Sequence, residues 1–235
     1  INNKVFVSAS TYDAGLPVSP HKFFSFDVDG TNRTLLLTTT GTDDIADFTI
    51  DRTNQRIYYV QGGSTIKWMR YDGTGVTTIH TSATRIFGCL ALNATKTTLY
   101  AVFDGTGADE GVISINVSNG ASTDTIFTSA STITVPQTRG QGAVDRDETF
   151  FVFVNDAFDV VKVPLNGTAE SVISAGTLSP YQAVTIDPFE ERIWWGRQYV
   201  LYSMNYSGGG LASVYNHNGG DPEEGEIFPI SLGTI

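Results

Sequence analysis

Five divergent copies of one strand-rich unit run through this chain. Each copy has a short strand with aromatic residues, a turn, a second strand and then a polar turn that contains Gly or Asn. The aromatic strands are residues 4–7, 56–60, 98–102, 149–153 and 192–195. The polar turns are residues 28–31, 71–74, 117–120, 165–168 and 206–208. A repeat of this size is typical of architectures built from one supersecondary unit, such as propeller blades or solenoid turns.

The length of the repeat predicts the fold. Five units in 235 residues give about 47 residues each, which is the usual size of a four-stranded blade. Runs of period two that are rich in Val, Ile, Thr, Tyr and Phe dominate, and no stretch keeps an apolar helical pattern for three turns. The sequence therefore predicts an all-β protein, a five-bladed β-propeller of four-stranded blades in a single domain over residues 1–235, with six blades as the alternative.

The two ends of the chain predict how the propeller closes. The first unit begins directly with its aromatic strand and lacks an inner strand, whereas a strand at residues 226–232 follows a complete fifth unit. Pairing the C-terminal strand into the N-terminal blade would satisfy both bare edges. Pro229 agrees with this, because the innermost strand has one edge without a partner, where proline is tolerated.

Four strands, named a to d from the propeller axis outward, can be assigned in each complete unit. In the second blade they are predicted at residues 46–50, 56–60, 65–70 and 76–80. In the fifth blade they are predicted at residues 182–186, 192–195, 200–205 and 211–215. In this architecture the d-to-a and b-to-c loops share the top face, and the a-to-b and c-to-d turns share the bottom face.

The repeat resembles the YWTD, or LDL-receptor-type, β-propeller family over nearly the whole chain. The shared features are an Asp after strand a, an aromatic pair in strand b and a Leu-Asp-Gly-Ser-like turn after strand c. They are best matched by Asp51, Tyr58, Tyr59 and the turn at 71–74, and by Asp187, Trp194, Trp195 and the turn at 206–208. The resemblance implies a propeller topology, although the family usually has six blades. Recurrence of the aromatic pair at one place in the repeat indicates packing between blades.

The charge of the chain excludes some partners. The net charge is −11, and the 14 Lys and Arg residues are scattered, whereas phosphate binding needs them clustered. We therefore expect neither nucleic acid nor an anionic membrane as a partner. No run approaches the roughly 18 apolar residues of a membrane span, so membrane insertion is not expected. The single cysteine, Cys89, lies in an apolar run and should pack in a buried inner strand.

Five Asn-X-Ser/Thr sequons suggest export from the cell. They are Asn32, Asn93, Asn116, Asn166 and Asn205. Four fall at or near c-to-d turns and Asn93 falls in an a-to-b turn, so the blade map predicts all five on the bottom face. Asn is also common in turns for reasons of backbone geometry, which explains the positions equally well. The chain starts without Met or a signal peptide, as a mature or trimmed terminus would, and we predict a secreted glycoprotein.

The loops of the top face are the predicted ligand-binding site. The longest b-to-c loop spans residues 8–22, and long loops on a rigid scaffold usually carry recognition. Aromatic rings beside Arg, Gln and Asp suit sugar or protein surfaces. The loops share no polar residue, so one site is expected rather than five. Its candidate residues are Tyr12, Asp13, Arg139, Gln141, Tyr181, Gln182, Arg197 and Tyr199.

Catalytic chemistry has weaker support in the sequence. The three histidines lack metal-ligand spacing, and no residue is assigned a catalytic role. Two acidic loops concentrate carboxylates, which hard cations favour. The weak metal candidates are Asp104, Asp109, Glu223 and Glu224. We expect no cofactor, unless these loops hold calcium.

Three functions fit these observations. The favoured one is a secreted, non-catalytic recognition protein that binds a glycan, as a lectin does, or an extracellular protein on its top face. The second is a calcium-dependent, lactonase-like hydrolase with its site at the mouth of the channel. The third is a structural component of an extracellular matrix. The sequence leans away from an enzyme, because no catalytic motif is present.

Overall fold

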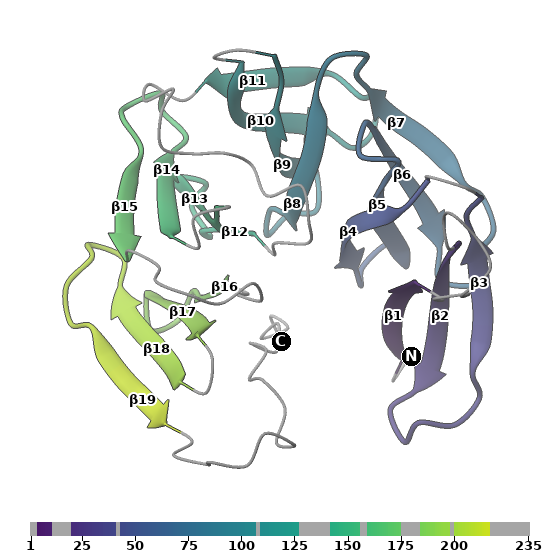
Figure 1. The fold of residues 1–235 in the computed structure, drawn as a ribbon, viewed down its shortest axis with the longest axis horizontal. Coiled ribbons are helices and arrows are strands. Elements are labelled where there is room, and N and C mark those ends of the chain that lie inside the picture. The colour runs from purple at the N-terminus through teal and green to yellow at the C-terminus, as the bar shows by residue number, and fades with distance from the viewer. Residues whose placement is uncertain are drawn as a thin grey trace. The chain divides into compact units, whose positions relative to one another are not determined.

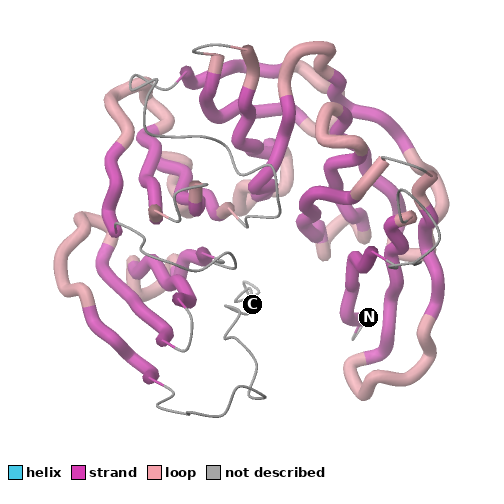
Figure 2. Tube along the Cα trace, viewed as in Figure 1, coloured by secondary structure: helices cyan, strands magenta, loops and turns pink. Residues whose placement is uncertain are grey.

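The computed structural model describes residues 4–10, 20–40, 43–106, 109–126, 142–155, 159–174, 184–197 and 200–216. Within these ranges the chain forms nineteen β-strands joined by turns and loops (Figure 2). None of the described residues belongs to a helix that could cross a membrane. The chain divides into two compact units, Ile1–Phe87 and Gly88–Ile235.

The first unit contains two antiparallel sheets, labelled in Figure 1. The first sheet has the order β1-β2-β3, formed by Lys4–Ser10, His21–Asp27 and Thr34–Thr38. The second has the order β4-β5-β6-β7, formed by Ile45–Asp51, Arg56–Gln61, Thr65–Arg70 and Thr77–Thr81. Each strand pairs with its neighbour in the sequence, so both sheets are simple meanders.

The second unit contains three four-stranded sheets of the same plan. One is made by β8 (Ile86–Leu92), β9 (Thr98–Asp104), β10 (Glu110–Asn116) and β11 (Ser122–Ile126). Another is made by β12 (Ala143–Val144), β13 (Phe150–Val154), β14 (Val160–Pro164) and β15 (Ser171–Ser174). The last is made by β16 (Val184–Asp187), β17 (Arg192–Arg197), β18 (Val200–Asn205) and β19 (Ala212–Asn216).

The fold class predicted from the sequence is confirmed: the protein is all-β, and its five sheets are the blades of a five-bladed β-propeller. In the described residues the first blade has three strands, β1-β2-β3, and the other four have four each. The predicted closing strand at residues 226–232 lies outside the described residues. Closure by that strand therefore stays a prediction.

The predicted strands of the second and fifth blades are confirmed within a few residues. β6 and β18, the third strands of these blades, have the predicted bounds. The outer strands β7 and β19 begin one residue later than predicted. The described part of β16 begins at Val184 rather than at Gln182, because Gln182 lies outside the described residues.

A turn with a positive-φ glycine follows β2 in the first blade and the third strand in each of the other four. Its glycine has a positive φ, a conformation that Gly adopts without the steric penalty that Cβ brings. This shared requirement is what keeps a Gly at one place in five otherwise divergent units. The five glycines and their φ angles are Gly30 (81°), Gly73 (82°), Gly120 (73°), Gly167 (79°) and Gly208 (87°).

A carboxylate or amide after the inner strand caps the next turn in four blades. Oδ1 of Asp51 accepts a hydrogen bond from the Asn54 amide at 2.9 Å. Oδ1 of Asp145 accepts two, from the amides of Thr149 and Phe150, both at 2.7 Å. Asn93 and Asp187 accept equivalent bonds. The Asp that carries the YWTD resemblance is thus a structural residue in these turns.

Most of the recurring aromatic residues pack in the core, as predicted, whereas Trp194 is only partly buried. Tyr58, Tyr59 and Phe151 are fully buried, and Phe150 and Trp195 are nearly so. Burying one such side chain contributes about 1.5–3 kcal/mol. In the first unit, one cluster joins both sheets through Phe6, Phe23, Ile45, Ile57, Tyr59 and Met69. Cys89 is buried in β8, again as predicted.

Candidate ligand-binding site

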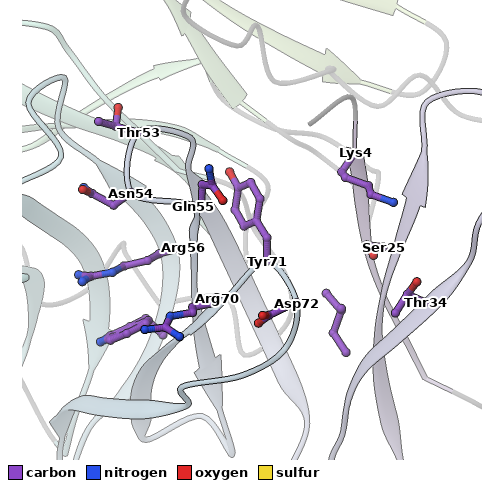
Figure 3. A pocket seen from close by; sticks show the side chains of 12 residues that line it. Lys4, Ser25, Thr34, Thr53, Asn54, Gln55, Arg56, Arg70, Tyr71 and Asp72 are labelled. Carbon is purple, nitrogen blue, oxygen red and sulfur yellow. The ribbon is translucent and has the colours of Figure 1, made fainter. Parts of the chain in front are cut away.

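A cavity of about 670 Å³ opens between the two sheets of the first unit (Figure 3). Lys4, Ser25, Thr34 and Leu36 line it from the sheet β1-β2-β3. The opposite wall is formed by the β4–β5 turn and by the ends of β5 and β6. A volume of roughly 300–1,000 Å³ is typical of small-molecule sites, so the cavity is large enough to hold a ligand.

The charge on the first wall is neutralised within the protein. The Lys4 Nζ lies 2.6 Å from Oδ1 of Asp27 in an ion pair. The amide nitrogen of Asn32 donates to Oδ2 of the same carboxylate at 2.6 Å. The hydrogen bond from Lys4, followed by that from Asn32, lowers the pKa of Asp27 from its usual 3.8. Lys4 is thus held by its own sheet.

Two arginines on the second wall have no such partner. Arg56, the first residue of β5, is the register partner of Arg70, the last residue of β6. The guanidinium of Arg56 lies 4.2 Å from the ring centroid of Trp68. Within the described residues neither arginine forms an ion pair. Side chains alternate along a strand, so Arg56, Trp68 and Arg70 lie on the face of this sheet opposite to Ile57, Met69 and Tyr71, which pack against the first sheet. Both arginines are thus directed away from the first sheet (Figure 3).

Tyr71 holds the β4–β5 turn, which forms part of the second wall. Its backbone amide donates to the Gln55 carbonyl at 3.2 Å, and its hydroxyl donates to the Asp51 carbonyl at 3.1 Å. Its ring lies 4.7 Å from that of Phe6 in the first sheet. Burial, and then the charge of Asp51, raises the pKa of Tyr71 to about 12. The turn at residues 53–55 is thereby held in place beside the cavity.

Asp72 is the carboxylate of the cavity lining, and its hydrogen bonds keep it ionised. Oδ1 accepts from the amide of Thr74 at 2.9 Å and from its hydroxyl at 2.7 Å. These bonds are the main cause of the lowered pKa of Asp72. The next residue, Gly73, packs closely against the first sheet. A Cβ on Gly73 would lie 2.5 Å from the carbonyl oxygen of Leu36.

The equivalent junction of the second unit is filled. Phe150 and Lys162 occupy the places of Lys4 and Ser25, since Phe150 pairs with Pro164 as Lys4 pairs with Asp27. The Lys162 Nζ donates to the carbonyl of Tyr206 at 2.6 Å and lies 4.2 Å from the ring centroid of Phe150. Smaller and differently directed side chains thus open the cavity at the first junction.

The ligand site predicted from the loops lies almost wholly outside the described residues. Arg197 is described as the last residue of β17, where its backbone pairs with Val200. The rest of that predicted site stays a prediction, namely Tyr12, Asp13, Arg139, Gln141, Tyr181, Gln182 and Tyr199.

The cavity at the first junction was not predicted from the sequence. Its lining comes from two different sheets, with Ser25 and Thr34 on one and Tyr71 and Asp72 on the other. No pattern within one strand reveals such a pairing of residues.

Two of the four acidic metal candidates, Asp104 and Asp109, are described. Asp104 is the register partner of Glu110, which is only 8% exposed and whose Oε2 has no hydrogen-bond partner in the described structure. Burial, followed by the charge of Asp104, raises the pKa of Glu110, and burial raises that of Asp104. Glu223 and Glu224 lie outside the described residues. Among those described, no three acidic, His or Cys side chains gather as metal ligands do.

The sequons differ in accessibility. Asn116, Asn166 and Asn205 are exposed, and each uses Oδ1 to accept hydrogen bonds within its own turn. Asn32 is exposed too. Asn93 is only 1% exposed, and its Nδ2 donates to Thr95, Thr97 and Glu148. A glycan on Asn93 would have to break this network, and the Nδ2 of Asn32 is engaged by Asp27. Asn116, Asn166 and Asn205 are therefore the better candidates.

Comparison with known proteins shows the fold and no family. No protein-family model and no curated protein matches the chain. A chain of the nidogen/laminin complex matches with a TM-score of 0.64 and 14% identity, over 88% of this chain and 76% of that one. An oligogalacturonate lyase in complex with manganese matches with a TM-score of 0.59 and 10% identity, over 83% of this chain but only 58% of the lyase. A TolB-like protein from Agrobacterium tumefaciens matches with a TM-score of 0.58 and 12% identity, over 91% and 81%.

At such low identities these matches establish a shared propeller architecture and nothing finer. The fold and the site together define the class of this protein: a β-propeller with a polar cavity at one junction between blades.

Proposed function

We propose that this protein is a non-catalytic recognition propeller that works outside the cell and binds an extracellular glycan or protein. The observation that carries the proposal is the cavity at the first junction. The ring of Tyr71, the carboxylate of Asp72 and the turn residues Asn54 and Gln55 line it. An aromatic ring beside carboxylate and amide groups suits the binding of a polar ligand.

The carboxylate of the cavity suits binding better than proton transfer. Asp72 has one oxygen engaged by Thr74, and its pKa is lowered. It therefore stays ionised at neutral pH, whereas a general acid or base works best with a pKa near the operating pH. Asp72 can accept hydrogen bonds from the hydroxyl or amide groups of a ligand.

Two observations support an extracellular role. Asn116, Asn166 and Asn205 are exposed sequon residues whose Nδ2 atoms make no hydrogen bond within the described structure. A chain of the nidogen/laminin complex, a protein assembly, shares the fold. We include in the proposal that the protein is a five-bladed relative of the YWTD propellers.

Filling the cavity tests the proposed function. The Ser25→Lys variant copies Lys162, whose amine reaches the backbone of the neighbouring blade at the filled junction. Wild-type protein and the variant are applied to a glycan array and to a panel of purified extracellular proteins. We expect at least one ligand that the wild type binds and the variant loses, while circular dichroism shows that the variant is folded. Binding of nothing by folded wild-type protein, or equal binding by both, would contradict the proposal.

The pair Asp104 and Glu110 favours a second candidate, a hydrolase that uses a buried carboxyl group or a calcium ion. Their adjacent positions, and the raised pKa of both, are features of catalytic carboxyl pairs as well as of structural ones. Calcium should then raise the melting temperature of the wild type and not that of Glu110→Gln. Lactone and ester substrates should be hydrolysed by the wild type alone. Absence of both effects would remove this candidate.

A further inference from the structure

We propose that Asn166 is a site of covalent modification, where the side-chain amide is lost as ammonia and the residue becomes aspartate or isoaspartate by reaction with water alone. Asn166 and Gly167 lie in the turn that follows β14, and both are exposed. The inference goes beyond the proposed function, because it depends neither on the cavity nor on what the protein binds.

The nucleophile of this reaction is the backbone nitrogen of Gly167. Once it has lost its proton to the solvent, it attacks Cγ of Asn166. A C–N bond forms, the bond from Cγ to Nδ2 breaks, and Nδ2 leaves as ammonia, so that a five-membered succinimide ring remains. Water then opens the ring, at Cγ to give aspartate or at the backbone carbonyl to give isoaspartate. The sum is one water consumed and one ammonia released, and Gly167 has no Cβ to obstruct the ring.

The backbone amide of Gly167 differs from those of the equivalent glycines. It donates no hydrogen bond within the part of the chain that the structure describes. In the other four turns, the amide of the positive-φ glycine donates to a backbone carbonyl at 2.8–3.0 Å, namely at Gly30, Gly73, Gly120 and Gly208. An amide held in this way must first lose a bond of about 0.5–1.5 kcal/mol. The nitrogen of Gly167 is therefore the most available nucleophile of the five.

The side-chain oxygen of Asn166 lies where it can stabilise the attack. Oδ1 accepts hydrogen bonds from the amide of Thr168 at 3.1 Å and from its hydroxyl at 2.9 Å. Negative charge develops on this oxygen when Cγ is attacked, and donors already placed at such an oxygen lower the barrier. The turn thus supplies two donors for the developing charge beside an unengaged nucleophile.

One other Asn-Gly pair among the described residues provides a comparison. Asn119 is exposed too, but the amide of Gly120 donates to the Asn116 carbonyl at 2.8 Å. Oδ1 of Asn119 accepts one hydrogen bond, from the amide of Ala121 at 3.0 Å. The two pairs have the same covalent chemistry and differ in what the fold does to them. Asn166 should therefore be converted faster.

The first two blades show that aspartate fits this turn. Residues 29–31 and 72–74 read Asp-Gly-Thr at the place of residues 166–168. In both, Oδ1 of the aspartate accepts from the amide and the hydroxyl of the threonine, at 2.7–2.9 Å. Aspartate at position 166 can keep the same two bonds, whereas isoaspartate lengthens the main chain by one carbon. Conversion also removes the sequon, because Nδ2 is the atom that would carry a glycan.

Peptide mapping by mass spectrometry measures both pairs in one sample. The whole protein, made in a host that attaches no glycans, is incubated at neutral pH, either folded or unfolded in guanidinium chloride. Chromatography separates the aspartate and isoaspartate products. We expect Asn166 to convert about threefold or more faster than Asn119 in the folded protein. The two rates should approach each other in the unfolded protein, where neither turn exists.

Three results would overturn the inference. They are equal rates at the two pairs in the folded protein, faster conversion of Asn119, and conversion of Asn166 only in the unfolded chain.

Variants of Thr168 test the role of its hydroxyl. Thr168→Val deletes this donor, keeps the branched shape and should slow conversion of Asn166 about two- to tenfold. Thr168→Ser keeps the donor and should convert at close to the wild-type rate. Conversion of Asn119 serves as the control and should be the same in both, and circular dichroism establishes that each variant is folded. Unchanged or faster conversion in Thr168→Val would show that the hydroxyl does not assist the attack.

Discussion

Two junctions between neighbouring blades share one framework and differ in what fills it. In the first unit, Tyr71 donates its hydroxyl to the Asp51 carbonyl at 3.1 Å. In the second unit, Tyr206 donates to the Asp187 carbonyl at 3.3 Å. Each ring also meets a phenylalanine of the preceding blade, at 4.7 Å for Phe6 and 4.9 Å for Phe150. The tyrosine framework is therefore common to both junctions.

The difference lies at two positions of the preceding blade. Where the second unit has Phe150 and Lys162, which pack against Tyr206, the first unit has Lys4 and Ser25. Lys4 is drawn to Asp27, and Ser25 is too short to fill the space that remains. A repeat can thus turn a packed junction into a cavity by changing two side chains, without changing the backbone plan that holds them.

The largest expected effect comes from the turn glycines. Gly73 and Gly208 occupy the same place and have φ angles of 82° and 87°. A Cβ on Gly73 would lie 2.5 Å from the Leu36 oxygen, whereas nothing lies within 4 Å of one on Gly208. Gly73→Ala should lose about 3 kcal/mol of unfolding free energy, and Gly208→Ala about 1 kcal/mol. Urea denaturation measures both, and equal losses would mean that the first junction is not packed as described.

The next largest loss of stability is expected from replacing Lys162, which fills the equivalent junction of the second unit. Lys162→Ser deletes the 2.6 Å hydrogen bond to Tyr206 and the contact with Phe150. It should lose about 2 kcal/mol, because a charged hydrogen bond disappears and a carbonyl loses its partner. Lys162→Met, which keeps the apolar stem, should lose less. No loss in Lys162→Ser, again in urea denaturation, would refute the contrast between the two junctions.

The shared framework predicts a smaller and equal effect at both junctions. Tyr71→Phe and Tyr206→Phe each remove one hydroxyl that donates to a backbone carbonyl. Each should lower the unfolding free energy by about 1 kcal/mol. Thermal unfolding of the two variants side by side gives the comparison. A difference well above about 0.5 kcal/mol would show that the two tyrosines are not equivalent.

The smallest expected effect is a pH dependence that belongs to the open junction alone. Lys4, and then Asn32, lowers the pKa of Asp27 below 3.8 in the folded protein. The stability that this gives is present above the unfolded-state pKa and is lost as the pH falls through the folded-state value. Melting temperatures between about pH 5 and pH 2 should therefore fall less steeply in Asp27→Asn and in Lys4→Met than in the wild type. Identical slopes would show that the ion pair adds nothing.

The strands and turns could be predicted because their signals are local. The bounds of β6 and β18 follow from alternating apolar residues between turn residues, and the positive-φ glycines mark the turns in the sequence itself. The burial of Tyr58 and Tyr59 follows from their recurrence in the repeat.

The cavity could not be predicted in the same way. It depends on Ser25 and Tyr71 facing each other across two sheets, which no pattern within one strand reveals. The loop residues chosen instead, such as Tyr12 and Arg139, were selected by loop length and composition and stay a prediction.

The most direct test of the account is a crystal structure of the protein in complex with a ligand that the array identifies. The account predicts density for the ligand in the cavity between the first two blades, beside Ser25, Tyr71 and Asp72. Density for the ligand at Tyr12, Tyr181 or Arg197, with this cavity occupied only by water, would contradict it.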